Sequence, residues 1–186
     1  MEKKDLKPAG VFKYFEEICQ VPRPSKKEEK MIAYLKAFGA KHNLETNVDE
    51  AGNVLIKKPA TPGKENLQTV VLQSHIDMVC EKNNDVQHDF LTDPIETEID
   101  GEWLKAKGTT LGADNGIGVA TELAILADDS IEHGPLECLF TVDEETGLTG
   151  AFALKEGFMS GDILLNLDSE DEGEIFIGCA GGIDSV

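Results

Sequence analysis

The sequence predicts an α/β domain in which helices flank a mostly parallel, mixed sheet. Segments with strand character alternate with segments of helical periodicity along the chain, a pattern typical of layered α/β folds. Three strand segments, at 69–74, 138–143 and 163–167, are rich in apolar residues, as expected for strands covered on both faces. The chain of 186 residues is long enough for one domain with a substantial core.

The first sixty residues predict two helices followed by two strands. Apolar residues within 11–18 recur at helical spacing, and Pro22 ends this helix. Ser25 and Glu28 have the spacing of a capping box, which predicts that a second helix begins there. Two short strands are expected on either side of the turn at 51–53.

The remaining elements are a hairpin, two helices and a final strand. Alternating residues on both sides of the Asp100-Gly101 turn predict the hairpin. Residues 115–129 would place apolar side chains on almost every face of a helix, which predicts a deeply buried helix. Residues 148–157 predict a second, short helix. Residues 173–186 have the pattern of a strand that has only just begun, so the chain looks interrupted.

Composition excludes some classes of partner. The balance of 17 basic against 36 acidic residues gives a net charge of −19, which disfavours nucleic acid and anionic membranes. The four cysteines are widely spaced and three adjoin apolar runs, as in proteins of a reducing compartment. With no apolar signal segment, we expect a soluble, cytoplasmic protein.

Acidic residues and one histidine follow the ends of the predicted hydrophobic elements. In open α/β sheets, ligands bind just beyond the carboxyl ends of the strands. If these ends lie side by side, one cleft receives His75, Asp77, Asp114, Glu144, Glu145 and Asp168.

Such a cluster predicts a site for divalent metal ions. Crowded carboxylates repel one another, and a cation removes this cost. One histidine with several carboxylates suits a hydrolytic site with two ions better than a structural zinc site. Asp114 is the natural bridge between ions, and Asp77 could hold the imidazole of His75. Glu144 and Glu145 are neighbours on an extended segment, where adjacent side chains point in opposite directions, so one is expected to bind metal while the other faces substrate as a base. Each motif alone could be incidental, for example a helix cap at Asp114.

Four stretches in order resemble a known family: "LQSHIDMVCEKN", "GTTLGADNGIGVA", "PLECLFTVDEETGLTGA" and "NLDSEDEGEIFIGCAGG". They are similar to the aminoacyl-histidine dipeptidases, carnosinase-like cytosolic enzymes within a larger group of di-zinc peptidases, aminoacylases and carboxypeptidases. The resemblance implies a three-layer, zinc-peptidase-like α/β domain. It also implies hydrolysis of Xaa-His dipeptides, such as β-alanyl-histidine, with two divalent ions, zinc or else cobalt or manganese.

The resemblance also implies a role for each residue of the cluster. One zinc would be held by His75 and Asp168, the other by Glu145, and both by Asp114. Glu144 would be the general base that takes a proton from the attacking water and passes it to the leaving amine. Asp77 would orient His75, and a cis peptide would follow the bridging aspartate.

Members of this family are longer than the present chain. Residues 1–186 are therefore expected to be the N-terminal part of the catalytic domain. The last histidine ligand and a lid or dimerisation domain would lie in the remaining part, so the parent protein is expected to form a homodimer and the fragment to have little or no activity. Two alternatives stay open: a tripeptide or N-acyl amino acid substrate, and a metal-binding domain without catalysis.

Overall fold

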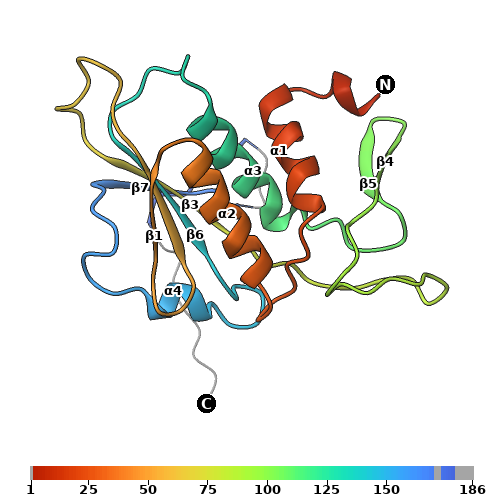
Figure 1. Cartoon of the computed structure of the whole chain (residues 1–186). Coiled ribbons are helices and arrows are strands. Elements are labelled where there is room, and N and C mark those ends of the chain that lie inside the picture. The colour runs from red at the N-terminus through yellow and green to blue at the C-terminus, as the bar shows by residue number, and fades with distance from the viewer. Residues whose placement is uncertain (1, 170–172, 179–186) are drawn as a thin grey trace.

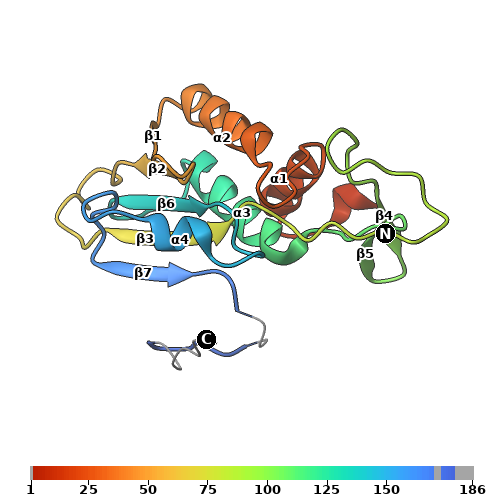
Figure 2. The same ribbon diagram turned by 90° about the horizontal axis from the view of Figure 1, so that it is seen from below.

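A five-stranded mixed sheet forms the framework of the computed structural model, which describes residues 2–169 and 173–178 (Figure 1). In sheet order the strands are β1 (Glu45–Val48), β2 (Val54–Lys58), β6 (Leu136–Thr141), β3 (Val70–His75) and β7 (Ile163–Asn166). β2 is antiparallel to both of its neighbours, whereas β3 is parallel to both of its own. The prediction of a mixed α/β sheet is confirmed, and its parallel part, β6-β3-β7, can be followed in Figure 2.

Helices cover the two faces of the sheet unequally. Side chains from α1 (Ala9–Cys19), α2 (Glu29–Lys41) and α3 (Ala113–Ala127) join one face of the strands in the main core, which includes Phe15, Leu35, Ile56, Leu123 and Phe140. On the other face, Leu55, Val71 and Leu139 pack against Leu154, Phe158 and Met159, which follow the short helix α4 (Thr149–Ala153). Alternate residues of one strand thus enter different cores, as the pleat requires.

The predicted hairpin is also present, as a separate two-stranded sheet of β4 (Thr97–Asp100) and β5 (Trp103–Ala106). Its turn contains Gly101 at φ +63°, a conformation that glycine adopts without steric cost. A short 3-10 helix, η1 (Lys3–Asp5), precedes α1. Within the described residues, no helix has the length and apolar character needed to cross a membrane.

The predicted capping box of the second helix is wrong. α2 begins at Glu29, and no side chain caps its first turn. The Ser25 hydroxyl instead donates to Asp77 Oδ2 at 2.8 Å. Glu28 Oε1 accepts hydrogen bonds from the backbone N–H of Lys26 at 2.9 Å and of Asp143 at 3.0 Å. Both side chains are therefore used in contacts with other segments, which a local spacing rule does not detect.

The last predicted strand forms, but it is not buried. Ile163, Leu164 and Leu165 of β7 are 40%, 49% and 48% exposed, because β7 is an edge strand that none of the described residues covers. The further strand expected at 173–186 is absent from 173–178, and its other residues lie outside the described part. The apolar pattern of β7 therefore predicts its strand conformation correctly and its burial incorrectly.

Candidate metal centre

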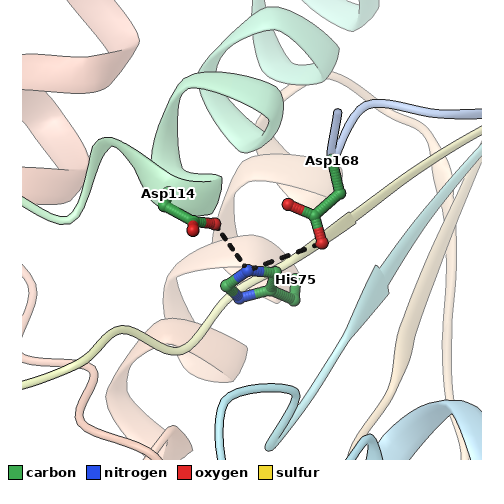
Figure 3. Close-up of side chains that lie close together, drawn as sticks. All are labelled: His75, Asp114 and Asp168. Carbon is green, nitrogen blue, oxygen red and sulfur yellow. Dashed lines mark hydrogen bonds and ion pairs between the residues drawn. The ribbon is translucent and has the colours of Figure 1, made fainter. Parts of the chain in front are cut away.

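The parallel strands β6, β3 and β7 place three chain segments together at their carboxyl ends. β3 ends at His75, the loop after β6 carries Glu144 and Glu145, and Asp168 follows β7. The first turn of α3 brings Asp114 to the same place. Figure 3 shows the side chains of Asp114 and Asp168 pointing toward the imidazole of His75.

The Nε2 atom of His75 is the centre of this cluster. It lies 3.0 Å from Asp114 Oδ1 and 3.9 Å from both Asp168 Oδ2 and Glu144 Oε2. His75 is 1% exposed, whereas Asp114 is 68% exposed, so the imidazole forms the floor of the site and the carboxylates its solvent side. Three of the carboxylates expected from the sequence thus approach one nitrogen of His75, and Asp77 lies at the other ring nitrogen.

Two sets of three ligand atoms share His75. Its nitrogen lies within 4.8 Å of oxygens of Asp114 and Asp168, and a second set combines it with Glu144 and Glu145, also within 4.8 Å. The expectation that the two glutamates point in opposite directions is wrong, since both offer an oxygen to the same set. The chain leaves β6 at Thr141 and turns at Asp143, where φ is +51°, so the segment is not extended.

A third set, Glu28, Asp77 and Asp143, is buried and has a different character. Its oxygens accept hydrogen bonds from backbone amides and from the hydroxyls of Ser25 and Thr146. These bonds satisfy the carboxylates and connect the loop after β6 to the chain before α2, so we interpret this set as structural.

Asp77 connects the imidazole to the loop that carries the two glutamates. Its Oδ1 lies 3.3 Å from His75 Nδ1 and accepts from the Glu144 N–H at 3.0 Å. Its Oδ2 accepts from the Glu145 N–H at 3.3 Å. Burial alone would raise the pKa of Asp77, but the hydrogen bonds from His75, Glu144 and Ser25 lower it to about 2.

The site raises the pKa values of His75, Glu144 and Glu145. Burial lowers the pKa of His75, but the hydrogen bond and charge of Asp77, with the charge of Asp168, outweigh it and raise the value to about 9. Burial raises the pKa of Glu144, His75 offsets part of this, and the charge of Asp168 adds to it. Burial and then the charge of Asp114 raise the pKa of Glu145. A cation bound at the imidazole would therefore have to displace the proton of His75.

Sequence reasoning did not find Asn115 as part of this site. The Asp114–Asn115 peptide bond is cis, as the resemblance implied. The Asn115 Nδ2 group donates to Asp168 Oδ1 at 2.8 Å and to the carbonyl of Leu167 at 3.0 Å. It thereby fixes the segment after β7 to the start of α3. The only signal in the sequence was its position next to Asp114.

Residues 71–180 match the model of peptidase family M20/M25/M40, which is more than half of the chain. The chain belongs to this family. The match covers all six clustered residues. Peptidases of this family generally bind divalent metal ions, and the imidazole nitrogen and carboxylate oxygens found here are a suitable donor set for them.

Two relatives match nearly the whole chain. It is 54% identical over 183 residues to the "Cytosol non-specific dipeptidase" of Escherichia coli (strain K12), covering 98% of the chain and 38% of the relative. It is 56% identical to an aminoacylhistidine dipeptidase structure from Vibrio alginolyticus, with a TM-score of 0.93, covering 96% of the chain and 36% of that structure. The chain thus spans little more than a third of the length of these relatives.

More distant structures have the same fold. The aminopeptidase PepT from Bacillus cereus is 26% identical with a TM-score of 0.74, covering 87% of the chain and 43% of that structure. A tripeptidase from Staphylococcus aureus is 23% identical with a TM-score of 0.73, again with 87% and 43% covered, and shows the likeness of fold alone.

Proposed function

We propose that the whole protein carrying this chain is a metal-dependent dipeptidase that hydrolyses Xaa-His dipeptides such as β-alanyl-histidine. The observation that supports it most is His75 Nε2, with oxygens of Asp114, Asp168 and Glu144 within 3.9 Å. The identities of 54% and 56% to two dipeptidases support the reaction class. The E. coli relative is named a cytosol dipeptidase, which supports a cytoplasmic location.

Two divalent ions, with zinc preferred over cobalt or manganese, fit the donor set. In this proposal His75 and Asp168 would hold one ion, Glu145 would hold the other, and Asp114 would contribute to both. When bound, the ions would polarise the peptide carbonyl and lower the pKa of a water molecule. Asp77 keeps the imidazole of His75 in place through its Nδ1 side, where the two atoms are 3.3 Å apart.

Glu144 is the general base of the proposed reaction. Its carboxylate is 28% exposed, with Oε2 on the solvent side of the buried imidazole. Oε2 accepts a proton from the attacking water and then donates it to the amine that leaves when the peptide bond breaks. Burial raises the pKa of this carboxyl above its ordinary value, which makes the carboxylate a stronger base.

Residues 1–186 are, in this proposal, the N-terminal part of the catalytic domain. The rest would supply the last histidine ligand and a dimerisation domain. The exposed apolar side chains of β7 support this division, because the remaining residues of a larger domain could cover them. The fragment alone is then inactive or weakly active, and it would act only as a metal-binding domain.

A second candidate keeps the reaction and changes the substrate. The E. coli relative is named a non-specific dipeptidase, and the Bacillus cereus relative an aminopeptidase. A panel of β-alanyl-histidine, Ala-Ala, a tripeptide and an N-acetyl amino acid, tested on the whole protein, separates these substrates. Preference for β-alanyl-histidine supports the first candidate, and equal rates on Ala-Ala support the second.

The decisive variant is Glu144→Gln in the whole protein. Without a base, kcat for the preferred substrate should fall by roughly 10²–10⁴, while the zinc content of the purified protein should stay unchanged. Glu156→Gln is the matched control, because Glu156 is exposed and lies outside the cluster. Hydrolysis by Glu144→Gln at the rate of the control would contradict the proposed mechanism.

A further inference from the structure

One buried cation lies directly behind the metal centre. Arg23, in the loop between α1 and α2, is 3% exposed. Its guanidinium forms no ion pair with any carboxylate in the described part of the chain. Its side-chain hydrogen bonds go to backbone carbonyls, at Ile76, Asp77 and Gly112. Removing a guanidinium from water is unfavourable, so a compensating role for Arg23 is expected.

The three acceptors belong to the two segments that carry the central ligand pair. Nη1 donates to the carbonyls of Ile76 and Asp77, both at 3.1 Å, directly after His75. Nη2 donates to the carbonyl of Gly112 at 2.6 Å, two residues before Asp114. One rigid, planar group thus joins the end of β3 to the start of α3, where His75 Nε2 and Asp114 Oδ1 are 3.0 Å apart.

The surrounding backbone leaves space for this group. A Cβ added at Gly112 would lie 2.5 Å from Arg23 Nη2, and one added at Gly116 would lie 2.7 Å from it. Gly112 also has φ +68°, which most other residues rarely adopt. The charges of Asp77 and Asp114 act on the guanidinium, so it also offsets the repulsion among the acids of the metal-free site.

We propose that Arg23 is a positioning residue of the metal centre: by tying the chain after His75 to the turn before Asp114, it sets the spacing of these ligands before metal binds. The inference rests on the proposed metal site. It predicts that loss of Arg23 weakens metal binding itself and does more than lower the stability of the fold.

The test compares Arg23→Met and Arg23→Lys with Lys58→Met in the whole protein. Lys58 is a suitable control, because it is also a buried cation that donates to two carbonyls, those of Ile125 and Asp128. These carbonyls lie at the opposite end of α3 from the metal centre. Lys58→Met should therefore lower the thermal midpoint without changing the affinity for zinc.

Zinc affinity is measured by competition with a chelating dye, and site geometry by the visible spectrum of the cobalt-loaded protein. Arg23→Met should weaken zinc binding by about 10–100-fold and change the cobalt spectrum. Arg23→Lys, which keeps the charge but cannot reach both segments, should recover only part of the affinity. Zinc affinity of both Arg23 variants equal to that of Lys58→Met would overturn the inference.

Folding and the proposed function are controlled separately. If Arg23→Met does not fold, Arg23→Lys decides by the same comparison, and an unchanged affinity and spectrum overturn the inference. If the parent protein binds zinc and hydrolyses dipeptides while the Arg23 variants bind zinc normally, only the role of Arg23 fails. If the parent protein binds no zinc, the proposed function fails as well.

Discussion

Asp77 shows how one buried carboxylate can organise several side chains of the proposed metal site. Its two oxygens contact the imidazole of His75, the N–H groups of Glu144 and Glu145, and the hydroxyl of Ser25. An asparagine at this position cannot satisfy the same partners. Its NH2 group can only donate, and it would face the N–H and O–H donors that both Asp77 oxygens now accept from.

Asp77→Asn should therefore weaken zinc binding by about 10–100-fold, the usual effect of losing a partner behind a metal ligand. The measurement is a zinc titration against a competing chelator, with the whole protein. Ser25→Ala removes a single hydrogen bond, of 2.8 Å, and should have a smaller effect. Equal zinc affinity of Asp77→Asn and the parent protein would show that the imidazole does not depend on this carboxylate.

At the scale of elements, the helix α3 packs tightly on β3 and brings an unusual polar group into the core. Glu122 is fully buried, and neither of its oxygens has a hydrogen-bond partner of good geometry in the described residues. Burial raises its pKa well above the ordinary value, although the Ser74 hydroxyl and the Cys138 thiol lower it in part. Burial therefore favours the neutral, protonated form of this carboxyl in the folded protein.

This burial makes stability depend on pH. The folded pKa of Glu122 lies above its unfolded value. The stability that the neutral carboxyl contributes is therefore fully present below the unfolded pKa. It is lost as pH rises toward the folded pKa, by up to about 1.4 kcal/mol per pH unit. The titratable group facing Glu122 is Cys138, whose own pKa burial raises well above normal, so the thiol stays neutral.

Glu122→Gln should abolish this dependence. The variant should unfold at higher urea concentration than the parent protein at pH 8, and the difference should shrink toward pH 4. Urea midpoints across this range, with a chelator present, test the prediction. The exposed Glu156→Gln serves as control and should follow the parent. A difference between Glu122→Gln and the parent that does not change with pH would contradict it.

Periodicity and strand ends predicted the elements and the six clustered residues, because both depend on local patterns. Two of the missed features depend on contacts between distant segments, and a third depends on one unusual backbone angle. Ser25 has the local spacing of a helix cap, yet its hydroxyl binds Asp77, 52 residues away. The carbonyls that Arg23 binds follow it by 53, 54 and 89 residues. The direction of Glu144 and Glu145 depends on the positive φ of Asp143, which the sequence does not mark.

At the scale of the whole molecule, the two edges of the sheet differ. β1 forms one edge, where its residues are mostly exposed and three of the four, Glu45, Thr46 and Asn47, are polar. β7 forms the other edge with three exposed aliphatic side chains in a row, Ile163, Leu164 and Leu165. An apolar edge strand with unpaired backbone groups is a template for pairing with another chain, whereas polar edges resist it.

The chain of residues 1–186, expressed by itself, should therefore associate with itself as its concentration rises, and Leu165→Lys should reduce this association. Sedimentation velocity measures it, and Leu67→Lys is the matched control, because Leu67 is 55% exposed in a loop outside the sheet. In the whole protein the same Leu165→Lys change should instead lower the thermal midpoint, because an unpaired ammonium would be buried where further residues cover β7. If Leu165→Lys leaves the thermal midpoint of the whole protein unchanged, β7 is an exposed edge strand in the whole protein as well. The remaining residues must then lie elsewhere, and the proposed division of the catalytic domain is wrong.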